Sequence, residues 1–196
     1  MPAIEPRPPV ERFLVIADID PQDSPVDALA GWLDTHNPAS VLLSFQSDDP
    51  VTIGDALTPL QAIIQDRDIA CLLEGDPNLA DALGCDGVQV TLDAEQEKTS
   101  TGQTIKNIRQ QVGDDLILGV ACGPSRHAGM LAAEQGADYV VFGPTHGEAA
   151  DLALAELAWW QVMMEPPCVA DYATTPDAIE ALYQAGADFV MIKPTR

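Results

Sequence analysis

Acidic, imidazole, phenol and amine side chains follow several segments of this sequence that have the apolar character of buried β-strands. These residues are Asp18, Glu74, Asp76, Asp93, His127, His146, Glu148, Asp171, Tyr172 and Lys193. In folds built from alternating strands and helices, the carboxyl ends of the strands carry the reactive groups. We therefore take these side chains as the candidates for a functional site.

Two of the acidic residues suggest a metal site. Asp76 and Asp93 follow consecutive predicted strands, and their carboxylate oxygens are the ligands that Mg²⁺ prefers. The alternative is that both are solvated loop carboxylates with no ligand.

His146 and Lys193 are the candidate catalytic residues. His146 follows a strand and is the best acid/base candidate, because histidine titrates near neutral pH without help; its alternative is an exposed loop histidine. Lys193 could supply an amine to a carbonyl substrate, or be held in an ion pair with Asp171. His127 lies in the first turn of a predicted helix and is expected to be structural or exposed.

The elements that would position these residues come from a repeated pattern. An apolar-striped helix, a glycine followed two residues later by aspartate, and a short β-branched strand recur in 79–90, 130–143 and 178–192. A weaker copy surrounds Gly113. Successive glycines lie about 25 residues apart, or twice that, which is the period of one strand–helix unit and predicts a TIM (β/α)8-type barrel.

The pattern along the whole chain predicts eight strands and seven helices in one domain. The strands are expected at 13–16, 41–43, 69–73, 87–90, 116–120, 139–142, 169–170 and 189–192. The helices are expected at 24–35, 55–66, 77–83, 105–112, 125–135, 152–164 and 176–185, with residues 48–54 as a polar loop. An open doubly wound sheet is the alternative, but Asp18-Ile19-Asp20-Pro21 stands where its glycine-rich phosphate loop would be.

The two ends of the chain raise the question of what covers the last strand. Residues 1–11 form a proline-rich arm, residues 12–196 form the barrel, and the chain stops four residues after the last predicted strand, so the closing helix is expected to be missing. The arm or a second subunit could cover this strand. We favour a homodimer, because an uncovered apolar face promotes association.

Composition narrows the classes of partner and compartment. Thirty-one Asp and Glu residues against nine Lys and Arg give a formal charge of −22, which disfavours nucleic acid and anionic membranes as partners. The sequence has no apolar run of membrane-spanning length and no signal-peptide pattern, so a cytoplasmic protein is expected. The four cysteines are scattered without a Cys-x-x-Cys pair and are expected to be buried structural thiols.

Four motifs resemble those of the thiamine phosphate synthase and thiazole tautomerase family. They are GCDGVQ at 84–89, LGV at 118–120, AAEQGADYVVFGP at 132–144 and AGAD at 185–188. The resemblance spans nearly the whole chain and implies a TIM barrel. It also implies the synthase reaction, which joins a pyrimidine diphosphate to a thiazole phosphate with magnesium and releases pyrophosphate.

The resemblance also assigns substrate-binding positions, and the residues found there differ from the family pattern. The arginine and lysine that hold the diphosphate after the second strand correspond to Ser44 and Gln46. The Asn-Asp-Arg after the third strand corresponds to residues 74–76, so Glu74 stands in this site and the metal-binding aspartate is replaced by glycine. The second metal aspartate falls on Ala94, beside Asp93.

Two further positions of the resemblance differ as well, the second of them on the thiazole phosphate side. The hydroxyl residue after the fifth strand is replaced by Ala121-Cys122, and the Gly-Gly pair after the seventh strand by Asp171-Tyr172. Each lost charge-assisted hydrogen bond to phosphate is worth roughly 1.5–3 kcal/mol. We therefore expect a diverged member in which the condensation is altered or lost.

Two hypotheses of different class follow. The first is an enzyme in or near thiamine biosynthesis that acts on a small molecule in a polar pocket holding His146, Asp76 and Asp93, with Mg²⁺ as a candidate cofactor. The second is a non-catalytic barrel that binds a small ligand or a protein partner, with a mouth blocked by Tyr172, Phe45 or the N-terminal arm.

Overall fold

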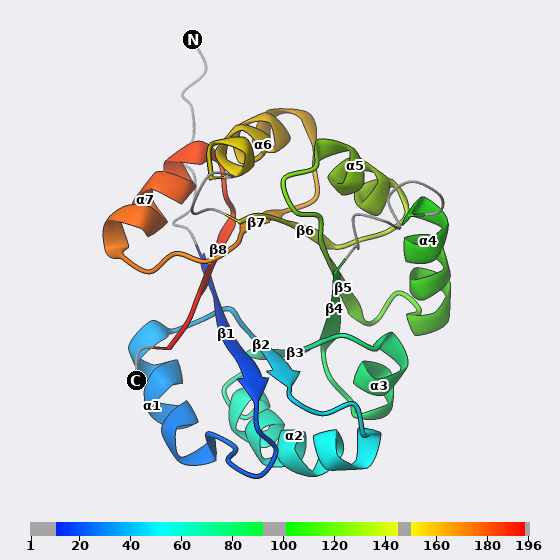
Figure 1. The fold of residues 1–196 in the computed structure, drawn as a ribbon, viewed down its shortest axis with the longest axis vertical. Coiled ribbons are helices and arrows are strands. Elements are labelled where there is room, and N and C mark those ends of the chain that lie inside the picture. Colours follow the sequence, from blue (N-terminus) through cyan, green and yellow to red (C-terminus); the bar gives the residue numbers. More distant parts are fainter. Residues whose placement is uncertain (1–10, 92–100, 145–149, 195–196) are drawn as a thin grey trace.

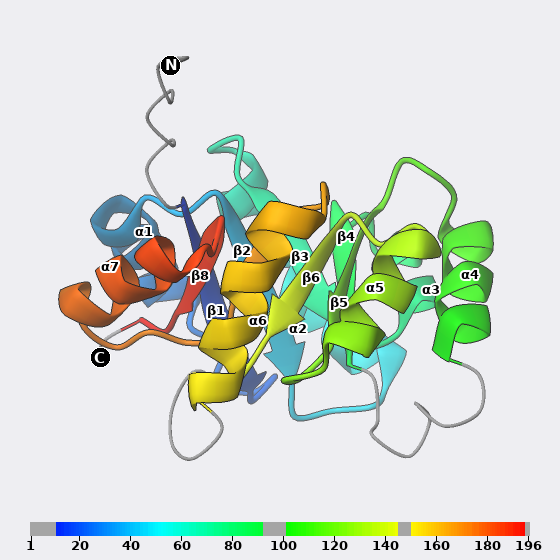
Figure 2. The same cartoon turned by 90° about the horizontal axis from the view of Figure 1, so that it is seen from above.

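The computed structural model describes residues 11–91, 101–144 and 150–194, and these form the predicted eight-stranded parallel barrel. Figure 1 shows the ring of strands surrounded by helices, and Figure 2 shows the same layers from above. The strands are β1 (Glu11–Ile19), β2 (Ser40–Phe45), β3 (Ala70–Glu74), β4 (Gly87–Thr91), β5 (Ile117–Ala121), β6 (Tyr139–Phe142), β7 (Cys168–Ala170) and β8 (Phe189–Ile192). The helices in the described residues are α1 (Val26–His36), α2 (Pro50–Gln65), α3 (Pro77–Ala82), α4 (Thr101–Val112), α5 (Arg126–Glu134), α6 (Ala150–Met163) and α7 (Pro176–Ala185).

Strand β1 closes the barrel, because it pairs in parallel with both β2 and β8. Its pairing with β8 begins at Glu11, opposite Phe189, so β1 starts two residues before the predicted strand and Glu11 belongs to the barrel rather than to the arm. Residues 1–10 of the predicted arm lie outside the described residues.

The predicted loop at 48–54 is wrong from residue 50 onward, where α2 begins. Asp49 caps this helix by accepting a 3.0 Å hydrogen bond from the backbone N–H of Thr52, and Pro50 occupies the first helical position. Proline is well tolerated there because the first N–H groups of a helix have no partner within it.

Alternating residues of the strands supply two separate cores. The larger core lies between the strands and the surrounding helices, and the smaller core fills the inside of the barrel. Fully buried members of the smaller core are Phe13, Val15, Leu42, Leu72, Tyr139, Val141, Val169 and Met191. All four cysteines are buried, as predicted.

The aspartate of each strong sequence repeat has the same structural role. Its side chain accepts a hydrogen bond from the backbone N–H of a residue at the start of the neighbouring strand or next to it. The pairs are Asp86 with Cys71 at 2.8 Å, Asp138 with Leu118 at 2.7 Å and Asp188 with Cys168 at 2.9 Å. The repeated aspartates therefore join adjacent strands at the end of the barrel where the strands begin.

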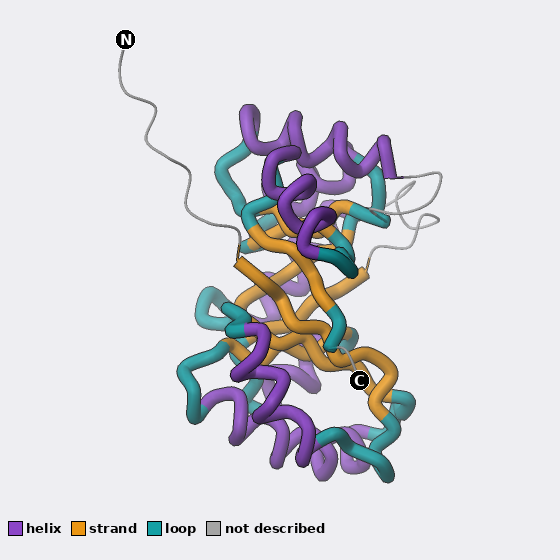
Figure 3. The backbone as a smooth tube through the Cα atoms, turned by 90° about the vertical axis from the view of Figure 1, so that its left-hand side faces the viewer, coloured by secondary structure: helices purple, strands orange, loops and turns teal. Residues whose placement is uncertain are grey.

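No helix follows β8 within the described residues, which extend only to Pro194. Figure 3 views the barrel from this side and shows strands between the helices above and below them. None of the helices in the described part of the chain is long and apolar enough to cross a membrane.

Candidate functional site at the barrel mouth

A cavity of about 350 Å³ opens at the carboxyl ends of the strands. Its lining comes from β2 to β8 or from the segments that directly follow these strands: Leu42, Glu74, Gln89, Thr91, Ala121, Gly123, Val141, Gly143, Pro144, Asp171, Tyr172 and Met191. No Lys, Arg or His is among these described lining residues. Active sites of (β/α)8 barrels lie at this end, so the cavity is the candidate site.

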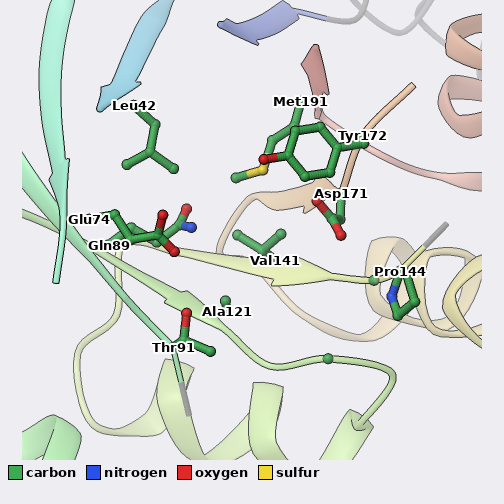
Figure 4. Close-up of a pocket in the computed structure, with 12 residues that line it drawn as sticks. Leu42, Glu74, Gln89, Thr91, Ala121, Val141, Pro144, Asp171, Tyr172 and Met191 are labelled. Carbon is green, nitrogen blue, oxygen red and sulfur yellow. The ribbon is translucent and has the colours of Figure 1, made fainter. Parts of the chain in front are cut away.

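Two carboxylates and one amide give the cavity its polarity. Glu74 ends β3, and Gln89 lies next to it in β4, while Asp171 follows β7. Figure 4 shows Glu74 and Gln89 side by side, with Tyr172 and Met191 on another wall. Burial raises the pKa of Glu74 above its usual range, and the negative charges of Asp18 and Asp171 raise it further. These carboxylates would repel an anion in the cavity.

Tyr172 forms the wall between the cavity and the outside of β8. Its backbone is in the left-handed region, with φ 38°, at the position where the resemblance predicted a glycine. The ammonium nitrogen Nζ of Lys193 lies 4.1 Å from the centre of the Tyr172 ring, a cation–π contact. The pKa of Tyr172 is raised to about 12. Burial is the largest cause, and the negative charges of Asp171, Glu74 and Asp18 add to it.

Lys193 contacts Tyr172 instead of forming the predicted ion pair with Asp171. Within the described residues, no ion pair joins these two side chains. Lys193 is exposed and is not part of the cavity lining. The structure thus places the predicted amine behind the aromatic ring and outside the cavity.

Asp171 is in close contact with the end of β6. A Cβ atom built on Gly143 would lie 2.4 Å from the Cβ of Asp171, far inside van der Waals contact. Gly143 is therefore required for the approach of Asp171 to the mouth. This pair was not recognised as a unit from the sequence.

The interior beneath the cavity holds a buried polar pair. The Tyr139 hydroxyl donates a 3.0 Å hydrogen bond to Oε1 of Gln89, and only 4% of the surface of each of these residues is exposed. Burial raises the pKa of Tyr139, so this phenol stays protonated over the physiological range. Neither residue was predicted as part of the site, although both stand at positions that alternate with outward-facing residues along their strands.

Ser44 and Gln46, at the positions of the family's arginine and lysine, position the end of β1. The Ser44 hydroxyl accepts a 3.1 Å hydrogen bond from the backbone N–H of Asp18, and Nε2 of Gln46 donates a 2.9 Å hydrogen bond to the Asp18 carbonyl. Asp18 has φ 55°, in the left-handed region. These two side chains hold a strained turn and supply no positive charge.

Only Asp76 of the predicted magnesium pair lies within the described residues. The Asp76 carboxylate is exposed and caps α3, where its Oδ1 accepts a 2.9 Å hydrogen bond from the backbone N–H of Asn78. Asp93 lies outside the described residues. In the described part of the chain, no three His, Cys, Asp or Glu side chains form a group that could hold a metal ion. The pairing of Asp76 with Asp93 therefore stays a prediction.

The remaining predicted site residues fall in three kinds of place. Cys122 is buried, with its Sγ 3.4 Å from the Val120 carbonyl oxygen, and does not line the cavity. His146 lies outside the described residues, and His127 is exposed on α5. Phe45 packs against the outer core and so does not block the mouth.

Comparison with known proteins shows the family to which the chain belongs. A family model described as thiamine monophosphate synthase matches residues 14–193. The thiamine-phosphate synthase of Rhodospirillum centenum is 42% identical over 170 residues, which cover 84% of this chain and 78% of that protein. The thiamine-phosphate synthase of Hyphomonas neptunium is 32% identical over an alignment 206 positions long. This alignment covers 96% of this chain and 86% of that protein.

A solved structure supports the same architecture. The thiamine phosphate pyrophosphorylase of Pyrococcus furiosus superimposes with a TM-score of 0.74, over 94% of this chain and 85% of that one. Sequence identity in this comparison is 16%, so it shows the barrel fold and carries no statement about the site.

Proposed function

Because the chain belongs to the thiamine monophosphate synthase family, we propose that it acts in thiamine biosynthesis on a small uncharged or cationic ligand bound at the barrel mouth. In this proposal, the condensation of a pyrimidine diphosphate with a thiazole phosphate is altered or lost. The observation that carries it is a cavity whose described lining contains Glu74 and Asp171 and no basic side chain.

The electrostatics of the mouth argue against a diphosphate. Glu74 already has a raised pKa because burial and two neighbouring carboxylates disfavour its charge, so a further anion would add to this repulsion. Each hydrogen bond between a cationic side chain and phosphate contributes roughly 1.5–3 kcal/mol. Ser44 and Gln46 supply none of these bonds, since neither side chain carries a positive charge.

The same groups suit a ring compound without phosphate. The Gln89 amide lines the cavity and the adjacent Glu74 carboxylate accepts hydrogen bonds, so together they can bind the polar edge of a heterocycle. The Tyr172 ring and Met191 offer an apolar wall against which such a ring can pack. His146 remains our candidate for proton transfer and Asp93 with Asp76 our candidate metal ligands, and no step is derived through a metal. Lys193, predicted as a possible amine, lies outside the cavity and is given no part in this reaction.

The alternative proposal is a barrel that binds a ligand without catalysis. It predicts a mouth blocked by Tyr172, Phe45 or the N-terminal arm. Tyr172 lines a cavity that is open in the described residues and Phe45 packs against the outer core, while residues 1–10 of the arm lie outside the described residues. A mouth that admits a small molecule supports ligand binding at this site and leaves catalysis to be tested separately.

Calorimetric titration at the mouth tests the proposal. The ligands are pyrimidine diphosphate, thiazole phosphate and pyrophosphate, each with and without Mg²⁺, together with the pyrimidine and thiazole alcohols that lack phosphate. We expect an alcohol to bind and Glu74→Gln to weaken that binding at least tenfold, with Asp115→Asn, on the opposite end of the barrel, as the matched control. Tight magnesium-dependent binding of the diphosphate, with release of pyrophosphate on mixing the two substrates, would overturn the proposal.

A further inference from the structure

A second hollow lies on the outside of the barrel, between α7 and α1 and over the edge where β8 meets β1. It has a volume of about 760 Å³. Its apolar floor includes Ile192 of β8 and Ala178 and Ile179 of α7, with Arg12 near one end and Lys193 near the other. We call it the α7–α1 groove; Figure 3 shows β1 and β8 running between the helices at this position.

The groove lies at the one junction of neighbouring strands that no helix of the described chain connects. Each of the other junctions between consecutive strands is bridged by a helix in the described chain, and at the β8–β1 junction no described helix lies between α7 and α1. Ala178 and Ile179 are half-buried without being closed off from solvent. Apolar hollows of this kind are favourable places for association.

The cations of the groove are distinctive because the other arginines with described side chains pair with acids. Arg67 pairs with Asp34, Arg109 with Asp138 and Arg126 with Glu156. By contrast, neither Arg12 nor Lys193 pairs with a carboxylate among the described residues. Arg12 donates a 3.2 Å hydrogen bond to the backbone carbonyl of His36, and Lys193 lies over the Tyr172 ring.

Charge therefore indicates an acidic occupant for the groove. The chain itself carries a net charge of −22 and presents exposed carboxylates directly beside the groove, at Asp177 and Glu180 on the outer face of α7. In a twofold dimer both copies contribute the same surface, and residue i of one copy contacts residue j of the other while j contacts i. The α7 helix of each copy can therefore lie against the groove of the other. Such an arrangement brings the acids of one copy to the cations of its partner.

We propose that a second copy of this chain docks in the α7–α1 groove, with α7 of each copy placed against the groove of the other. Apolar contacts to the half-buried Ala178 and Ile179 would supply the newly buried surface, with the already buried Ile192 beneath them. Pairing of Arg12 and Lys193 with Asp177 and Glu180 of the other copy would set the register.

Two charge-reversal variants test this arrangement. Variant one carries Arg12→Glu and Lys193→Glu, and variant two carries Asp177→Lys and Glu180→Lys. We expect the unaltered protein to dimerise in sedimentation equilibrium, each variant alone to dimerise at least tenfold more weakly, and an equimolar mixture of the two to recover dimers. Recovery follows because the reversed groove of the first variant faces the reversed helix of the second, while the other half of the interface keeps its native charges.

A matched control and a folding check complete the test. Lys106→Glu with Asp115→Lys reverses exposed charges on the α4 side of the barrel and should leave the dimer unchanged. Far-ultraviolet circular dichroism and thermal unfolding of each variant identify any loss of fold. A protein that stays monomeric up to hundreds of micromolar, or dimers that survive both reversals, would overturn the proposal.

Discussion

The hydroxyl of Tyr139 in β6 donates a 3.0 Å hydrogen bond across the barrel interior to Oε1 of Gln89 in β4. Between these strands lies β5, where Gly119 has no side chain and leaves room for the Tyr139 ring. Phe13 packs on the same ring edge-to-face, with centroids 5.2 Å apart. The amide that lines the mouth is thus positioned by an aromatic residue deep in the barrel.

Replacing Tyr139 by Phe should destabilise the protein and loosen Gln89. The change removes one donor and leaves a nearly buried amide oxygen without its partner, which costs about 1–2 kcal/mol. Urea unfolding measures this loss directly. The double variant Tyr139→Phe with Gln89→Leu should lose less than the sum of the two single changes, and strict additivity would contradict the coupling.

Gly119→Ala should be strongly destabilising. A Cβ there would lie 2.0 Å from Cζ of Tyr139, and the ring is held by Phe13 and cannot move away cheaply. Overpacking of this kind costs about 1–3 kcal/mol or more. The matched control is Gly31→Ala on α1, where a Cβ meets nothing within 4 Å and a gain of roughly 0.5–1 kcal/mol is expected. Thermal unfolding that ranked the two variants in the opposite order would rule out this account of the interior.

Asp138→Ala tests the role of the repeated aspartates. It removes the acceptor for the backbone N–H of Leu118, which is fully buried, and also the partner of Arg109. Leaving such an N–H unpaired should cost about 1–3 kcal/mol in the free energy of unfolding. Asp114→Ala, in the weaker copy of the repeat, changes an exposed residue and should stay within about 0.5 kcal/mol. Equal losses from the two changes would show that the hydrogen bond is unimportant.

The barrel could be predicted because its signal is repeated. Each strong copy contains a helix end, an aspartate and a strand, and Asp86, Asp138 and Asp188 all have the same hydrogen-bonding role. The start of α2 was missed because polar residues around Asp49 favoured a loop, whereas the Asp49 cap and Pro50 begin a helix there. Capping depends on two or three residues and is easily hidden in a polar stretch.

The site was predicted less completely than the fold. Glu74, Asp171 and Tyr172 were predicted from their places at strand ends, and all three line the mouth cavity. Gln89 was missed although Gln89 and Thr91 alternate with Val88 and Val90 along β4, a period of two that could have marked both as facing the cavity. Ser44 was expected to meet substrate and instead bonds Asp18, since a short hydroxyl near a tight turn finds a backbone partner first.

The stability of the protein should depend on pH through Glu74 in a direction opposite to that of an ordinary surface carboxylate. Its pKa is raised in the folded state, by burial first and then by Asp18 and Asp171, so folding disfavours its ionised form. Below the unfolded pKa the group is neutral in both states and costs nothing, and the cost develops as pH rises through the raised folded pKa. Glu74→Gln should therefore stabilise the protein at pH 7, and this gain should vanish toward pH 4.

Asp49→Ala should change the stability in the opposite direction to Glu74→Gln. The pKa of Asp49 is lowered by its hydrogen bonds with Thr52, so its contribution is present above its unfolded pKa and is lost as pH falls through the folded one. The variant should be less stable than the unaltered protein at pH 7, with a difference that shrinks toward pH 3. Urea unfolding from pH 3 to pH 8 measures both series. If the difference in unfolding free energy between Glu74→Gln and the unaltered protein were the same at every pH, the pKa of Glu74 would not be raised in the folded state. The electrostatic argument against a diphosphate would then lose its basis.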